Sequence, residues 1–135
     1  MTALRKMFKL RRKEVPWEVV DNKFVDPSPT FYGEEELDVE TVSRTDIKGT
    51  YVFDMKNGYA GIQDLQKALT FSRKQLLQEA TRRGYNALLV ESWQLTIFQK
   101  AKQRRVEVRY SGRPARCAGD VPSAQTPPFI GILYT

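Results

Sequence analysis

Seven basic residues are crowded between positions 100 and 116, and they are the side chains of this sequence best suited to binding chemistry. Only one acid, Glu107, interrupts them. Arginine forks match phosphate and carboxylate oxygens, so such a row could bind a nucleic acid, another polyanion or an acidic protein partner. The candidate binding residues are Lys100, Lys102, Arg104, Arg105, Arg109, Arg113 and Arg116.

The same residues would also suit an ordinary solvated sheet face, or a face whose charges are paired with Asp38 and Glu40. Arg105 and Arg109 share one side of an expected strand, about 13 Å apart at about 3.3 Å per residue. No RNP-like or helix-turn-helix signature accompanies them. Polyanion binding and a solvated or ion-paired face therefore both remain open.

Catalytic chemistry is poorly provided for. The sequence has no histidine and a single cysteine, Cys117. It therefore lacks the commonest general base near neutral pH, and Ser/His/Asp or Cys/His triads are impossible. A zinc site would have to be built largely from carboxylates.

Glu79 or Glu91 could act as an acid or base only if burial raised its pKa. The basic run before Cys117 favours the thiolate, but the sequence offers no histidine or second cysteine to act with it. We predict a protein that is not an enzyme and needs no metal or cofactor.

Composition limits the class of protein. The 135 residues are 41% hydrophobic and 28% charged, as expected of one soluble globular domain. Strictly apolar runs such as 87–90 are too short to span a bilayer, so no integral membrane insertion is expected. A lone cysteine and the absence of a secretory hydrophobic region favour a cytoplasmic location.

Charge is divided along the chain. Residues 1–13 are basic, 14–60 are mainly acidic and 61–135 are again basic. The first block alternates basic and apolar residues, which fits an amphipathic helix, an organelle presequence or a disordered arm. The blocks could be solvated faces and a tail, or the acidic and basic blocks could face each other, within one subunit or between subunits.

Three regions are expected along the chain. Residues 1–30 form a basic arm and a proline-containing linker, with at most a short strand near 17–25. Residues 31–116 form the core domain, in which 37–41 alternates as a half-buried strand and 50–53 is a second strand, closed by an Asn57-Gly58 turn. Residues 117–135 form a proline-bearing linker and an apolar end.

The segment 62–83 is expected to be one long helix of about 30 Å. Its apolar stripe extends back to Ile62, with Arg73 and Lys74 off the stripe, and it is formed by Leu65, Leu69, Ser72, Leu76 and Ala80. Asp64 suits the first turn or the N-cap, and Gly84 suits the left-handed position after the last turn.

Two strands follow the helix. Residues 85–98 begin as a buried apolar run and then alternate, with Trp93, Leu95 and Ile97 on one side. A connection at 99–103 leads to a strand at 104–110, which is expected to end at 111–114. The fold class is therefore α+β: an antiparallel sheet of about four to five strands packed on one long helix, with extended N- and C-terminal segments.

Residues 76–112 resemble part of the YbjQ-like family. The similar segments are Leu76–Ala80, Arg83–Val90 and Val106–Gly112, in which a helix ends in a Gly-x-Asn-Ala turn and a later strand ends near an aromatic-x-Gly. That family is small, α+β and ring-forming, with a suggested role in heavy-metal binding. The resemblance implies the fold and self-assembly. The absence of histidine and the single cysteine argue against metal binding here.

The apolar C-terminal end is expected to take part in assembly. After the linker it contains Phe129, Ile130, Ile132, Leu133 and Tyr134. Such a segment could pair with a strand edge or dock in a groove, of its own subunit or of a neighbour. A sheet with apolar residues toward both sides exceeds what one helix can cover, so we predict a homo-oligomer. The expected partner is the chain itself.

Overall fold

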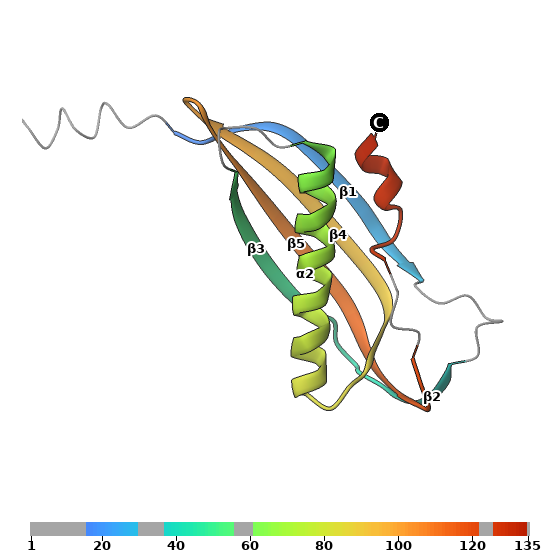
Figure 1. The fold of residues 1–135 in the computed structure, drawn as a ribbon. Helices are drawn as coiled ribbons and strands as arrows, with labels where there is room; N and C mark the ends of the chain where they lie inside the picture. Colours follow the sequence, from blue (N-terminus) through green and yellow to red (C-terminus); the bar gives the residue numbers. More distant parts are fainter. Residues whose placement is uncertain (1–15, 30–36, 56–60, 122–125, 135) are drawn as a thin grey trace, which may run out of the picture.

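The computed structural model describes residues 16–29, 37–55, 61–121 and 126–134. These residues form a five-stranded antiparallel sheet with one α-helix on one of its faces (Figure 1). The α+β class with an antiparallel sheet is thus confirmed. The elements are β1 (Glu18–Pro29), β2 (Asp38–Val42), β3 (Ile47–Met55), α2 (Ile62–Arg82), β4 (Ala87–Lys100), β5 (Gln103–Ala118) and the short 3-10 helix η2 (Ile130–Tyr134).

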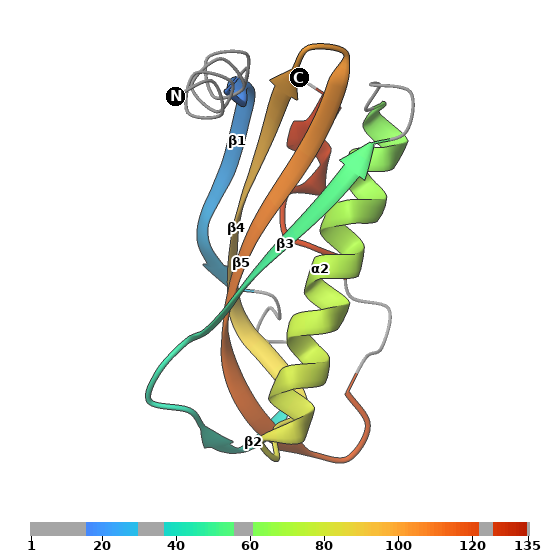
Figure 2. The same ribbon diagram turned by 90° about the vertical axis from the view of Figure 1, so that its left-hand side faces the viewer.

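The sheet is built around the β4–β5 hairpin. β1 lies beside β4, while β3 and β2 both pair with β5, β3 along its first half and β2 at its end. Figure 2 shows β1 and β3 on opposite sides of the central hairpin, with α2 against one face. No helix among the described residues lies on the other face, which we call the open face.

Helix α2 has 21 residues, and local signals set its ends. The backbone N–H of Gly61 donates to the Asp64 carboxylate at 3.2 Å, so Asp64 stabilises the first turn. At the other end, the N–H of Tyr85 donates to the carbonyl of Ala80, and Gly84 has a φ of 92°. This is the glycine-ended termination expected from the sequence.

The predicted core pattern is confirmed. All five stripe residues of α2 are buried against the inward-facing residues of the central hairpin. Ile62, expected to extend the stripe, is exposed, and Arg73, expected off it, is buried. The inward-facing residues of the hairpin are Trp93, Leu95, Ile97, Val106, Val108 and Tyr110.

The first strand differs most from the expectation for residues 1–30. Instead of a linker with a short strand, residues 18–29 form a 12-residue strand paired with β4. Its prolines are tolerated because β1 is an edge strand and its register shifts between Val25 and Ser28. The sheet therefore begins before residue 31. Residues 1–13 and the Asn57-Gly58 turn lie outside the described residues.

Two other strands depart from the expected pattern. β2 is exposed at all five positions and is not half-buried, since it is an edge strand that adds hydrogen bonds but no core side chain. β5 does not end at 111–114 but continues to Ala118. Pro114 lacks an N–H, and the neighbouring β4 shifts register between Leu88 and Glu91, which accommodates it.

Candidate functional site

Most of the basic cluster lies along β5, and four of its five arginines are paired with acids. Four ion pairs join it to acids of β5 and of the β2–β3 region, so part of the cluster is neutralised within the chain. The pairs are Arg105–Asp54 at 2.8 Å, Arg109–Glu107 at 2.9 Å, Arg113–Asp46 at 2.6 Å and Arg116–Glu40 at 3.8 Å. Glu40 was an expected partner, whereas Asp46 and Asp54 were not.

The other three basic residues lie near the turn of the β4–β5 hairpin. Lys100, Lys102 and Arg104 have no ion pair to an acid among the described residues. The ring of Trp17 lies close by, 4.3 Å from the Arg105 guanidinium carbon and 5.8 Å from Lys100 Nζ. Among the described residues, three cations without an acidic partner thus lie together at the hairpin turn.

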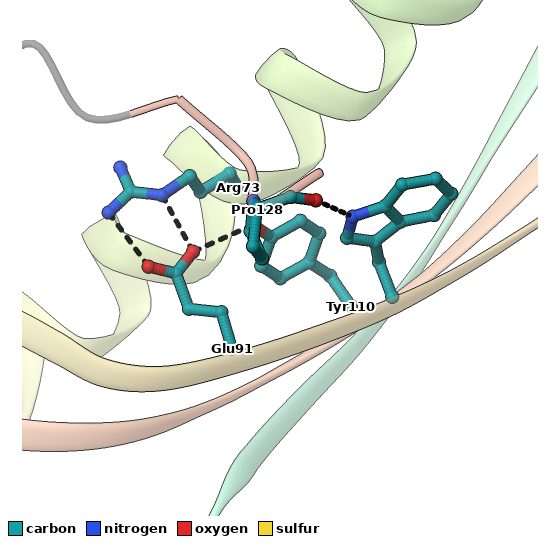
Figure 3. A network of polar contacts seen from close by, with 5 residues as sticks. Arg73, Glu91, Tyr110 and Pro128 are labelled. Atoms are coloured by element: carbon teal, nitrogen blue, oxygen red, sulfur yellow. Dashed lines mark hydrogen bonds and ion pairs between the residues drawn. The ribbon is translucent and has the colours of Figure 1, made fainter. Parts of the chain in front are cut away.

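A second polar group is buried between α2 and the sheet (Figure 3). Glu91 of β4 is fully buried, and Arg73 of α2 binds it in a forked arrangement, with Nε 2.7 Å from Oε1 and Nη2 3.1 Å from Oε2. The Tyr110 hydroxyl donates to the same Oε1 at 2.7 Å. Burial, reinforced by the negative charge of Glu91, raises the pKa of Tyr110 above its usual value.

The network of Arg73, Glu91 and Tyr110, which we call the clamp, has a structural character. Every buried side-chain nitrogen and oxygen of the described residues has a hydrogen-bond partner. A buried ion pair costs desolvation energy, which only such complete pairing offsets. Glu91 is held on both oxygens and is not exposed, so a substrate could reach it only if α2 moved.

The sequence contained only part of the signal for this clamp. Arg73 follows Leu69 by one helical turn and therefore lies at the margin of the apolar stripe. Glu91 stands where the apolar run of β4 changes to alternation, and the register shift before it turns its side chain toward α2. A buried acid in an apolar strand predicts a buried basic partner, but the sequence does not say which one.

The C-terminal segment folds back onto the same face as α2. The indole Nε1 of Trp93 donates to the Pro128 carbonyl at 2.9 Å, and Lys23 Nζ donates to the Ile132 carbonyl at 3.2 Å. Leu133 is 3% exposed and belongs to the core, whereas Phe129 is 63% exposed. The expected extended segment is therefore a 3-10 helix docked on its own chain, with some apolar side chains left outside.

Cys117 lies in a small cluster with Ala87 and Ala115 at the end of β5. Burial, together with Asp38 and Glu40, raises the pKa of its thiol. The expectation that the preceding basic run favours the thiolate is therefore wrong, because nearer acids and desolvation outweigh it. Its backbone and the Asn86 side chain exchange two hydrogen bonds of 2.8 Å, which fix the start of β4.

The open face contains a hollow of about 520 Å³. It lies over the middle of β4 and β5 and reaches β1 on one side and β3 on the other. Hydroxyl, amide, charged and aromatic side chains are mixed in its lining, which includes Phe24, Lys48, Ser92, Gln94, Arg109 and Ser111. None except Arg109 had been singled out from the sequence.

Comparison with protein-family models, with curated proteins and with solved structures found no match. Among the described residues, no helix is long and apolar enough to cross a membrane.

Proposed function

We propose that this chain is a non-catalytic binding module that assembles with copies of itself. The observation that carries the proposal is the direction of the two sheet edges. β1 is antiparallel to β4, β4 to β5, and β5 to β3. β1 and β3 therefore run in opposite directions, so β1 of one subunit could join β3 of the next in one continuous antiparallel sheet.

Both edges are suited to such pairing. Among the described residues, β1 pairs only with β4 and β3 only with β5. Val19 and Val20 are exposed on β1, and Val52 is exposed on β3. Pro27 and Pro29 lack an N–H donor, so pairing with a neighbouring subunit would be limited to the first half of β1. Repetition of this head-to-tail contact around a twisted sheet gives a ring or a filament.

The enclosed position of Glu91 favours the non-catalytic part of the proposal. The buried charged group at Glu91 is enclosed and fully hydrogen bonded, and the remaining described ion pairs are at the surface. The resemblance to the ring-forming YbjQ-like family supports assembly, and the lone cysteine supports a cytoplasmic location. The C-terminal residues Phe129 and Tyr134, both exposed, could add contacts between subunits.

Light scattering coupled to size exclusion tests assembly. The full-length chain should have a mass that is a multiple of 15.6 kDa. Val20→Lys should shift the mass toward the monomer while its melting temperature as a monomer stays within a few degrees, because lysine on an edge strand opposes pairing. Ile62→Lys, at an exposed apolar site on α2, is the matched control and should leave the mass unchanged. A wild-type monomer across micromolar concentrations contradicts the proposal.

Polyanion binding is the second candidate, and the unpaired charge at the hairpin turn favours it. Lys100, Lys102 and Arg104, with the nearby Trp17 ring, offer cations and an aromatic surface to a single-stranded nucleic acid. Fluorescence anisotropy with labelled RNA should then show salt-sensitive binding that a Lys100→Glu, Lys102→Glu double variant abolishes.

A double variant of two ion-paired arginines is the comparison for the variant at the hairpin turn. Arg105→Glu with Arg109→Glu should leave the fold intact, since exposed pairs contribute about 0–1 kcal/mol each. If this double variant weakens RNA binding as much as the variant at the turn does, the whole strand face is the binding surface. If neither affects binding, or if no binding is seen, polyanion binding is rejected.

A further inference from the structure

The hollow on the open face arises from side-chain size. Its floor is formed by Ser92 and Ser111, which are directly opposite each other on β4 and β5. Trp93 and Tyr110 next to them point into the core, so by strand alternation both serines face the open side. Longer side chains surround this small-residue floor, which leaves a depression about as large as an ordinary small-molecule site.

Two rungs of the sheet supply the polar groups. Lys48 of β3 is opposite Ser111, which completes a first rung of Ser92, Ser111 and Lys48. Two residues along the strands, Gln94 and Arg109 are opposite each other and continue to Thr50. The lining thus combines three hydroxyls with an amide and two cations.

The charges around the hollow are balanced. Lys48 and Arg109 are matched by the carboxylates of Asp26 and Asp46 in the lining. Arg109 is also paired with Glu107, and Asp46 with Arg113. A phosphate placed here would meet two carboxylates, so net attraction for an anion is small. A neutral ligand with many hydroxyls, each able to donate and to accept, suits this mixture better.

An aromatic ring completes the site. Phe24 of β1 is opposite Gln94 and lines the hollow, yet it is 59% exposed. The bonds that hold Gln94 and Thr96 to the Asn22 side chain, at 3.1 and 3.2 Å, keep this part of β1 in place beside β4. A flat apolar ring beside hydrogen-bonding groups can cover the C–H face of a pyranose while the polar groups bind its hydroxyls.

We infer that the open face binds a neutral sugar residue of a glycan, with Phe24 against the ring and Ser92, Ser111, Gln94 and Arg109 on its hydroxyls. The inference rests on the binding part of the proposed function and not on self-assembly. A chain that stays monomeric would still bind the sugar.

Two-dimensional NMR of the ¹⁵N-labelled full chain tests it, with maltotriose, cellotriose and chitotriose as probes at millimolar concentrations. At least one sugar should shift the amides around Ser92, Gln94, Arg109 and Ser111 in a saturable way. The same titration with inorganic phosphate should leave these amides unchanged. Light scattering on the same samples reports assembly separately, so failure of one proposal is not mistaken for failure of the other.

Two variants locate the site. Phe24→Ala should weaken sugar binding about tenfold, the usual effect of losing an aromatic contact. Phe71→Ala removes an exposed phenylalanine from α2, on the other side of the sheet, and should leave the affinity unchanged. Ser111→Trp should fill the floor and abolish binding, with the rest of the spectrum showing an intact fold. The inference is overturned if no sugar shifts these amides, if phosphate alone does, or if Phe24→Ala binds as well as wild type.

Discussion

Glu91 and Arg73 show how one buried ion pair can define the position of a helix on a sheet. The forked contact fixes both the rotation of α2 and its distance from β4, because two hydrogen bonds must form at once. Tyr110 adds a third bond from β5, so the clamp spans three elements. Such groups contribute little net stability when intact, but they penalise any other packing of α2.

Replacing Glu91 by glutamine should therefore be strongly destabilising. The buried guanidinium of Arg73 would face a neutral amide in place of a carboxylate, and we expect a loss of about 3–5 kcal/mol in the free energy of unfolding. Urea denaturation measures it. Glu79→Gln, which alters a surface pair with Arg82 and Arg83, is the control and should cost less than about 1 kcal/mol.

A double variant separates charge from shape. Arg73→Met with Glu91→Gln leaves no buried charge and should be more stable than Glu91→Gln alone. If the double variant is the less stable of the two, or if Glu91→Gln is as mild as the control, the network does not act as a clamp.

Tyr110 should make stability fall at alkaline pH. Its pKa is raised in the folded chain, so above about pH 10 the unfolded chain loses this proton while the folded chain keeps it. In this range the Tyr110 hydroxyl lowers the free energy of unfolding by about 1.4 kcal/mol for each pH unit. Denaturation at several pH values above 9 should show a shallower decline for Tyr110→Phe than for wild type, although the variant starts from a lower stability. Equal slopes would show that Tyr110 ionises as freely in the folded chain as in the unfolded chain.

At the scale of elements, the C-terminal segment behaves as part of the core. Leu133 is buried among core residues, and Gln66 of α2 donates to the Tyr134 hydroxyl. On the sheet face that α2 covers, the C-terminal segment packs beside β1, where the single helix does not reach. It therefore completes the layer that α2 begins.

Deletion after Pro128 should lower stability by about 2–3 kcal/mol, chiefly through the loss of the buried Leu133 side chain. It should also weaken assembly if Phe129 and Tyr134 make contacts between subunits. Deleting residues 1–13 should do neither. Melting curves and sizing of both truncations make the comparison, and equal stability of the C-terminal truncation and the full chain would show that η2 is only a loosely attached end.

At the scale of the whole molecule, charge is separated along the chain and rejoined in space. Acids at positions 40, 46 and 54 pair with arginines at 116, 113 and 105, so the acidic and basic blocks meet within one subunit. The sequence had also left open solvated faces and pairing between subunits. It leaves the hairpin turn as a region of unpaired positive charge among the described residues.

Metal removal should have no effect on the folded chain. With no histidine and one cysteine, the sequence has few of the soft or imidazole ligands that zinc or copper requires. Chelator treatment is therefore expected to leave the melting temperature unchanged. A chelator-induced decrease that added zinc reverses would show that carboxylates hold a structural metal.

The sequence alone determined the elements whose signals are local. The five-residue stripe of α2, its glycine-ended terminus and the alternation within β4 and β5 depend on residues close together in the chain, and they were found where they were expected. The finer expectations were wrong: Ile62 lies outside the stripe, Val90 in the apolar run of β4 is exposed, and β5 continues to Ala118. The absence of histidine limits the chemistry in the same way, because it holds for any fold of this chain.

Tertiary structure decided what depends on neighbours distant in sequence. β1 is a strand because β4 offers it an edge, although its prolines and charges are typical of a linker. Arg73 is buried because Glu91 lies opposite it. Arg105 and Arg113 of β5 are paired because acids of the β2–β3 region reach them. The hollow on the open face likewise comes from small residues aligned on adjacent strands. Register creates such contacts, and no periodicity within a single segment encodes register.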